Sequence, residues 1–270
     1  MVEDRVERFR QLHHQGSPLL LPNPWDVGSA RVLASLGFAA LATTSSGFAA
    51  TLGRLDGSVS RDEVLEHARI MVAATELPVS ADMENGFADE PEAVARTVRL
   101  AMGVGLAGCS IEDFTGRSDD PIYRAEHAVE RIRAAAEAVR SDPTGLVLTA
   151  RAENYLHGRP ELADTISRLQ AFQGAGADVL YAPGLRDLDD IRSVVTSLDR
   201  PVNVLAVPGG PSVAELAEAG VHRISVGGRF AFAALGALVE AGRELLAGSH
   251  TGFTERAALG VEAARNAFGS

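Results

Sequence analysis

Eight short apolar segments, rich in aliphatic and β-branched residues, recur along the whole chain. They begin at Leu19, Ala39, Pro78, Gly108, Gly145, Asp178, Pro201 and Arg223. The residues between them place apolar side chains three and four positions apart, as in Leu162, Ile166 and Leu169, which is the spacing of an amphipathic helix. Strands that are apolar on both faces and alternate with helices are typical of a parallel sheet. The pattern therefore predicts an α/β protein with eight parallel strands.

The number of strand–helix units and the length of the chain together predict a (β/α)8 TIM barrel. Such barrels occupy about 250 residues, and this chain has 270. The alternative is an open, doubly wound sheet, but no G-x-G-x-x-G motif follows the first strand. No linker or change of composition divides the chain. We therefore expect a single domain over residues 1–270, in which residues 232–270 form a C-terminal helical extension.

The expected helices carry start and end signals. Three pairs have capping-box spacing, in which side chains and backbone N–H groups satisfy each other: Ser60 with Glu63, Asp89 with Glu92, and Ser212 with Glu215. Glycines stand just before four expected strands, where a left-handed C-cap would turn the chain back toward the sheet. These are Gly37, Gly105, Gly176 and Gly220.

The composition excludes several classes of function. The formal charge of -11, from 36 acidic and 25 basic residues, disfavours a nucleic-acid-binding surface. The single cysteine, Cys109, excludes an intramolecular disulfide and a cysteine-built metal centre, and it fits a reducing compartment. The N-terminal segment lacks the apolar stretch of a secretory signal, and no apolar run reaches the ~18 residues that suggest a membrane span. We expect a cytoplasmic protein with neither nucleic-acid nor membrane partners.

Acidic side chains gather where the expected strands end, and there the βα loops of a parallel barrel carry its chemistry. Period-two alternation places Asp82 and Glu84 on one face of the third strand, and Glu112 closes the fourth. Carboxylates crowded at one rim would raise one another's pKa unless a cation neutralised them. An all-oxygen set of this kind predicts Mg²⁺, or Mn²⁺ in its place. The alternative is that the acids cap the following helices or pair with arginine.

A series of motifs resembles the isocitrate lyase/phosphoenolpyruvate mutase superfamily. The motifs are Asn23-Pro24-Trp25-Asp26, Ser29-Ala30-Arg31, Gly37-Phe38, Thr43-Thr44-Ser45-Ser46-Gly47, Asp82-x-Glu84-Asn85-Gly86 and Ile111-Glu112-Asp113. Their order and spacing cover about residues 18–230, and the combination is more specific than any single motif. The resemblance implies a Mg²⁺-dependent barrel that acts on the C–C or C–P bond next to a 2-oxo acid. It also implies an oligomer, commonly with C-terminal helices exchanged between subunits.

The resemblance further implies a set of metal ligands. Asp82 would be the principal metal carboxylate, with Glu84, Glu112 and Asp56 holding metal-bound waters. The family's third-strand motif commonly has two aspartates, and Glu84 replaces the second of them. Its longer side chain would shift a metal-bound water by about one methylene without abolishing the site.

The same resemblance implies how a substrate is held. Arg151 would bind a substrate carboxylate, for which its planar fork is suited, and the backbone N–H groups around Ser45, Ser46 and Gly47 would receive an oxyanion. Trp25 and Asp26 would border the pocket. We expect the reaction itself to depend on three residues, Arg151, Ser46 and Glu112.

The loop after the fourth strand departs from the pattern. The isocitrate and methylisocitrate lyases have a Lys-Lys-Cys-Gly type motif there, whose cysteine is the catalytic acid, whereas residues 114–120 read FTGRSDD. Cys109 lies inside the strand, out of phase with Glu112, so we expect it to pack against the helix layer. The absence of the motif disfavours classical isocitrate or methylisocitrate cleavage. The loop is also shorter than in the phosphonate mutases, which disfavours C–P chemistry.

Other groups near the expected mouth have two interpretations each. Asn203 either donates to a ligand or is a core amide bonded to backbone. The glycines in residues 209–212 and 227–229 either bind a phosphate or form tight turns. Tyr155, His157 and Tyr181 could serve as acid or base, but we favour supporting roles.

The apolar segment at residues 230–242 predicts a contact with another subunit. Its sequence, FAFAALGALVEAG, is apolar on most sides, more than one barrel contact requires. We therefore expect a homodimer or homotetramer.

These observations predict a Mg²⁺-dependent lyase-type enzyme that acts on a small 2-oxo or 2-hydroxy carboxylic acid. The reaction would pass through an enolate, by cleaving or forming a C–C bond or by decarboxylation. One alternative is a phosphonate or phosphoenolpyruvate mutase-type enzyme, or an enzyme of a phosphorylated metabolite. Another is a 2-oxo acid binding protein without catalysis. The sequence does not identify the general acid or base.

Overall fold

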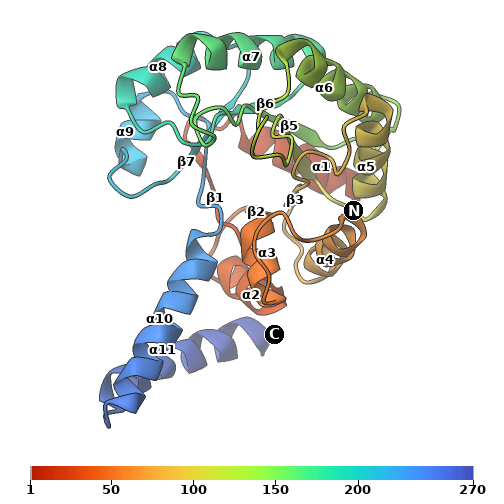
Figure 1. Cartoon of the computed structure of the whole chain (residues 1–270). Helices are drawn as coiled ribbons and strands as arrows, with labels where there is room; N and C mark the ends of the chain where they lie inside the picture. Colours follow the sequence, from red (N-terminus) through yellow and green to blue (C-terminus); the bar gives the residue numbers. More distant parts are fainter. Residues whose placement is uncertain (1, 270) are drawn as a thin grey trace.

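Eight parallel strands form a ring that is surrounded by helices (Figure 1). The computed structural model describes residues 2–269. The strands are β1 (Leu19–Leu21), β2 (Leu41–Ala42), β3 (Val79–Asp82), β4 (Gly108–Glu112), β5 (Val147–Arg151), β6 (Val179–Tyr181), β7 (Val202–Leu205) and β8 (Arg223–Ser225). They pair in the order β1-β8-β7-β6-β5-β4-β3-β2. The Ala42 N–H donates to the Pro22 carbonyl at 3.1 Å, which bridges the remaining seam between β1 and β2. The predicted (β/α)8 barrel is confirmed.

Helices follow the strands as the apolar spacing predicts. They are α1 (Val2–Leu12), α2 (Val27–Ser35), α3 (Ser45–Thr51), α4 (Arg61–Ala73), α5 (Pro91–Gly103), α6 (Ala125–Arg140), α7 (Leu162–Ala175), α8 (Leu188–Thr196), α9 (Val213–Glu218), α10 (Arg229–Leu246) and α11 (Thr251–Phe268). The described residues contain no helix that is both long and apolar enough to cross a membrane.

Two of the three predicted capping boxes are confirmed, at the starts of α4 and α9, where Ser60 and Ser212 are the N-caps. The third prediction is wrong. The N-cap of α5 is Glu90, which makes no side-chain cap, and the Asp89 carboxylate instead accepts a hydrogen bond from the Tyr123 hydroxyl. The four predicted helix-ending glycines are confirmed in a left-handed conformation, with φ between 81° and 109°.

The core has two layers, and the inner one closes the bottom of the barrel. Outside the ring, the strands pack against the helices, and Cys109 lies in this layer with no exposed surface, as predicted. Inside the ring, Phe9 of α1 lies fully buried among apolar strand residues. A side chain at Gly108 would collide with the Phe9 ring, so a glycine is required where α1 enters. Helix α1 therefore seals the end of the barrel opposite the strand ends.

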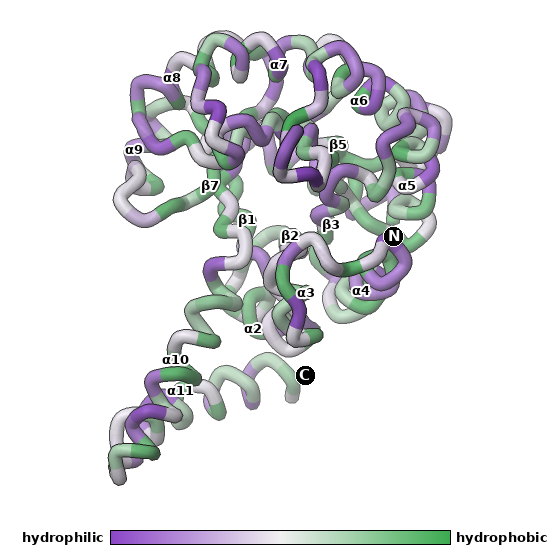
Figure 2. The backbone as a smooth tube through the Cα atoms, in the orientation of Figure 1, coloured by the Kyte–Doolittle hydropathy of each residue, from purple (hydrophilic) through white to green (hydrophobic). Residues whose placement is uncertain are grey.

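The C-terminal hairpin of α10 and α11 extends away from the barrel (Figure 1). Helix α11 contacts α2 of the same chain. Much of the apolar surface of the hairpin is nevertheless uncovered, and Figure 2 shows hydrophobic stretches along it. Leu238 is 67% exposed and Leu246 91% exposed. An exposed apolar surface of this kind is typical of a protein–protein contact. The predicted contact with another subunit would cover it, and helix exchange between subunits stays a prediction.

We expect the protein without substitutions, called the parent below, to sediment as a dimer or tetramer of the 28.3 kDa chain. The double substitution Leu238→Asp and Leu246→Asp should shift it to the monomer mass, because each aspartate would have to be desolvated in the contact. Analytical ultracentrifugation measures the mass. Leu36→Asp is the control, because Leu36 is similarly exposed (68%) but lies outside the hairpin. A monomeric parent would contradict the prediction.

Candidate active site

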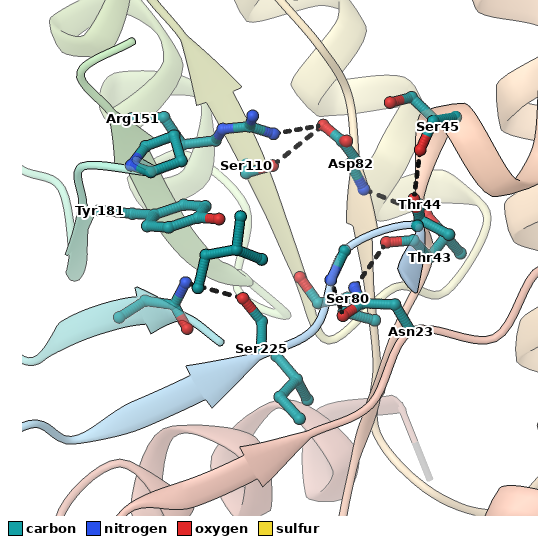
Figure 3. Close-up of a pocket in the computed structure, with 18 of the residues that line it drawn as sticks. Asn23, Thr43, Thr44, Ser45, Ser80, Asp82, Ser110, Arg151, Tyr181 and Ser225 are labelled. Carbon is teal, nitrogen blue, oxygen red and sulfur yellow. Dashed lines mark hydrogen bonds and ion pairs between the residues drawn. The ribbon is translucent and has the colours of Figure 1, made fainter. Parts of the chain in front are cut away.

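A polar pocket of about 150 Å³ opens at the carboxyl ends of the strands (Figure 3). Its lining includes Asp82, Ser110, Arg151 and Tyr181 from four neighbouring strands, β3 to β6. A second hollow of about 250 Å³ adjoins it and shares Arg151 and Asp56 with it. Glu84 and Glu112 line this second hollow. The structure thus brings the predicted strand-end acids together around one mouth.

Arg151 is the centre of this arrangement. Its guanidinium contacts three carboxylates: Asp82 Oδ1 at 3.0 Å, Glu112 Oε2 at 3.1 Å and Glu153 Oε1 at 2.7 Å. It also lies 5.3 Å from the centre of the Tyr181 ring. Burial opposes the charged form of Arg151, but the surrounding carboxylates raise its pKa well above the ordinary value. Arg151 is therefore a permanent cation held at a fixed position.

The acidic side chains around Arg151 outnumber this single cation. Burial raises the pKa of Glu112 well above its usual range, and Glu153, Asp82 and Glu84 raise it further. Burial likewise raises the pKa of Glu84 to about 8, with contributions from Asp82 and Asp56. The Oε1 atom of Glu84 is buried and has no hydrogen-bond partner. The site therefore has carboxylate oxygens that a single arginine does not satisfy.

Glu84 reaches the mouth by a route that strand alternation does not describe. Strand β3 ends at Asp82, and Glu84 has a left-handed backbone with φ 46°. Its N–H donates to Asp82 Oδ1 at 3.2 Å, and its carbonyl accepts from the Glu112 N–H at 3.0 Å. The alternation argument for Glu84 was therefore wrong, although its side chain lines the predicted region. The strained turn ties the ends of β3 and β4 together.

The carboxylates suit a hard divalent cation in type, although they are not closed around one. Within residues 2–269, no three Asp, Glu, His or Cys side chains are positioned to hold a metal ion together. Arg151 lies between Asp82 and Glu112 instead. The donors are all oxygens, the acids outnumber Arg151, and one Glu84 oxygen is unpaired. This donor set fits Mg²⁺ or Mn²⁺.

The predicted oxyanion turn is the first turn of helix α3. Ser45 and Ser46 line the pocket. Gly47 is buried, and its N–H points to the Thr44 hydroxyl at 3.5 Å. A side chain at Gly47 would collide with Thr44 and press on Trp25. Gly47 is thus required for packing rather than for close approach to a ligand.

Trp25 and Asp26 do not line either hollow, contrary to the prediction. The Asp26 carboxylate caps α2 by accepting from the Ser29 N–H at 2.7 Å. The Trp25 carbonyl contacts His67 Nε2 at 3.0 Å. Both residues therefore support the wall behind Ser46 rather than the pocket surface.

Asn203 lines the pocket and is buried in a hydrogen-bond network inside the barrel. Its amide nitrogen donates to Ser225 Oγ at 3.0 Å, and its oxygen accepts from Arg223 Nε at 2.9 Å. Arg223 also lines the pocket, and the sequence analysis did not identify it. The available signal was an arginine at the start of the eighth expected strand segment.

The loops after β4 and β8 are held by contacts within the protein. Phe114 stacks on His157 at 4.0 Å and pairs with Ile122 in a β-bridge, so residues 114–120 form a short closed turn. After β8, the N–H groups of Val226 and Gly227 both donate to Asn23 Oδ1 at 2.9 Å. These two donors are therefore engaged and do not face a phosphate.

Comparison with protein families agrees with this arrangement. The family model described as phosphoenolpyruvate phosphomutase matches residues 9–246, which is most of the chain. The chain belongs to the phosphoenolpyruvate phosphomutase family. The resemblance predicted from the strand-end motifs is thereby confirmed.

Members of the phosphoenolpyruvate phosphomutase family with different activities are similar to this chain. An oxaloacetate decarboxylase of Pseudomonas fluorescens is 34% identical, over 90% of this chain and 85% of its own. A crystal structure from Burkholderia cenocepacia J2315, whose activity is given only as lyase/mutase, is 52% identical with a TM-score of 0.90, over 93% and 91% of the two chains. The structure of 2,3-dimethylmalate lyase is 30% identical with a TM-score of 0.82, over 92% and 89%.

In this phosphoenolpyruvate phosphomutase family member, a buried arginine binds the backbone of the loops that carry the acidic residues. Arg131 of α6 has no exposed surface and donates to the carbonyls of Asn85, Ala88 (3.1 Å) and Glu112 (3.0 Å). Its guanidinium lies 4.2 Å from the Tyr123 ring centre. Arg131 thus connects the two loops that carry the acidic residues.

Replacing Arg131 with methionine should lower the free energy of unfolding by about 3 kcal/mol, because buried carbonyls lose their donors. Arg131→Lys should recover part of the loss. Urea unfolding measures both. Arg133→Met is the matched control, because Arg133 is exposed on the same helix. An effect as small as that of the control would show that the carbonyls do not depend on Arg131.

Proposed function

We propose that the protein is a Mg²⁺-dependent lyase-type enzyme that forms or stabilises the enolate of a small 2-oxo or 2-hydroxy carboxylic acid. The reaction would cleave or form a C–C bond, or remove a carboxylate. The observation that carries the proposal is the meeting of Asp82, Glu84 and Glu112 with Arg151 at one strand-end mouth. Within the proposal, the protein is a cytoplasmic homo-oligomer.

Asp82 would hold the metal, with Glu84, Glu112 and Asp56 around it. When bound, Mg²⁺ would supply Lewis-acid stabilisation of the negative charge that develops on the substrate oxygens. Mn²⁺ prefers the same oxygen donors and could replace it. The unpaired Oε1 of Glu84 supports this assignment. The pKa of Glu112 also supports it, because burial and the neighbouring acids raise this pKa although Arg151 opposes the shift.

Arg151 would bind and orient a substrate carboxylate. A guanidinium has five N–H donors, and three of its nitrogens already contact Glu153, Asp82 and Glu112. The remaining N–H groups can donate to the substrate while the carboxylates keep the side chain still. Preorganised donors of this kind cost no rearrangement during the reaction. Ser46 on the opposite wall would donate its hydroxyl to a substrate oxygen.

The names of the relatives support a carboxylic acid as substrate. The similar proteins include oxaloacetate decarboxylases and a 2,3-dimethylmalate lyase, and both names describe reactions of dicarboxylic acids at C–C bonds. A phosphorylated substrate is less well supported, because the Val226 and Gly227 N–H groups after β8 already donate to Asn23 Oδ1. The missing cysteine motif in residues 114–120 argues against isocitrate cleavage.

Pyruvate, oxaloacetate, 2-oxoglutarate and phosphonopyruvate, assayed with and without Mg²⁺, test this proposal. We expect Mg²⁺-dependent turnover of at least one 2-oxo carboxylic acid. Turnover of phosphonopyruvate alone would instead indicate C–P chemistry. Ligand-induced thermal stabilisation without any turnover would indicate a binding protein.

Asp82→Asn should lower kcat/KM for the accepted substrate by about a hundredfold or more, because the principal metal carboxylate is lost. The same variant should lose the rise in melting temperature that Mg²⁺ gives the parent. Asp189→Asn is the control, because the Asp189 side chain is 88% exposed on α8. Unchanged activity and unchanged Mg²⁺ stabilisation in Asp82→Asn would contradict the assignment.

A further inference from the structure

Arg223 places a second cation deep in the substrate pocket. It is the first residue of β8, and its side chain points into the barrel, where it is only 4% exposed. It lines the same pocket as Arg151. Below it lies α1, which seals the barrel with Phe9. The Arg223 guanidinium therefore lies between the pocket and His13, the residue that follows α1.

The contacts of Arg223 are all with neutral groups. Its Nε donates to Asn203 Oδ1 at 2.9 Å, its Nη2 donates to Thr149 Oγ1 at 3.1 Å, and its Nη1 lies 3.3 Å from His13 Nε2. The contact with a cation makes His13 Nε2 an acceptor, so His13 Nδ1 carries the proton and donates to the Phe9 carbonyl at 2.7 Å. Burial, together with the charge of Arg223, lowers the pKa of His13 to about 3. His13 therefore stays neutral and adds no charge.

No carboxylate neutralises Arg223 in the part of the chain that the structure describes. Arg151 forms three ion pairs there, whereas Arg223 forms none. A buried charge without a counter-charge is costly, and proteins rarely retain one without a partner or ligand. The upper part of the pocket thus carries an excess of acids, and its deep end carries an unpaired cation.

The deep end has further groups that could donate to an anion. Three of the five N–H groups of Arg223 are used by Asn203, Thr149 and His13, so two remain. Ser80 and Ser225 present hydroxyl groups to the same pocket, whereas the Ser110 hydroxyl donates to Asp82 Oδ1 at 3.4 Å (Figure 3). A guanidinium surrounded by hydroxyl donors is suited to a carboxylate.

The separation of the two ends fits a short chain of carbon atoms. Thr149, which contacts Arg223, precedes Arg151 on β5 by two residues, a rise of about 6.6 Å at the usual strand spacing. A four- or five-carbon acid can extend over such a distance with one carboxylate at each end.

We infer that Arg223 binds a second carboxylate of the substrate, so the site selects dicarboxylic 2-oxo or 2-hydroxy acids over monocarboxylic ones. This inference rests on the proposed function, because it assumes that the first carboxylate lies at the Arg151 end.

Two pairs of ligands with equal carbon numbers test the inference. Malate is compared with 2-hydroxybutyrate, and 2-oxoglutarate with 2-oxovalerate, by calorimetry in the presence of MgCl₂. The members of each pair differ only in a terminal carboxylate or methyl group. We expect the parent to bind the dicarboxylate of at least one pair about ten- to a hundredfold more tightly, as is typical of a charged hydrogen-bonded contact.

Arg223→Gln should reduce that preference to about unity, and Arg223→Lys should retain part of it. The ratio within a pair is independent of a partial loss of folded protein, because such a loss weakens both apparent affinities equally. Arg200→Gln, at an exposed arginine before β7, is the matched control and should keep the parent ratio.

The outcomes separate the two proposals. If the parent binds acids in a Mg²⁺-dependent manner but equally within both pairs, the role of Arg223 is wrong and the proposed function stands. The role of Arg223 is also wrong if Arg223→Gln weakens both members of a pair equally. If the parent binds none of the four acids, the Arg223 inference fails. The proposed function fails with it only if no 2-oxo carboxylic acid is turned over either.

Discussion

The site depends on the ion cluster around Arg151. Four charged side chains from β3, β4, β5 and the loop after β5 meet there, with separations of 2.7 to 3.1 Å between Arg151 and its carboxylate partners. In a low-dielectric environment each acid would be costly to ionise alone. The guanidinium lowers that cost for three of them at once, and the short strands bring them together because they end at the same rim. Under the proposed function, the carboxylate oxygens that Arg151 does not satisfy would bind the divalent cation.

Two sets of backbone contacts hold the loops after β3 and β4 together behind the cluster. Arg131 connects the carbonyls of the β3 and β4 loops, and the left-handed Glu84 connects the same loops from the pocket side. Such backbone conformations persist only where the surrounding structure holds them. The position of the acids is therefore set by backbone contacts as well as by the strands.

The sequence predicts the barrel, the rim on which the acids lie and the family, because these depend on local patterns and on the ends of strands. It gives the wrong path for Glu84, because a left-handed turn breaks the alternation after Asp82. It misplaces Trp25 and Asp26, because an N-cap and a pocket carboxylate look alike in one dimension. It misses Arg131 and Arg223, whose partners are carbonyls and neutral side chains from distant segments. Contacts of this kind leave no spacing in the sequence.

The seal that α1 makes beneath the strands has a kinetic consequence. Because α1 and Phe9 close one end of the barrel, substrate and products enter and leave through the same opening at the strand ends. For a reaction that splits one molecule into two, departure is then ordered by depth: the fragment nearer the opening leaves first, and the inner fragment remains until its path is clear. The inner fragment is the product released last, so it is the one that rebinds to the free enzyme. It should therefore be the stronger product inhibitor.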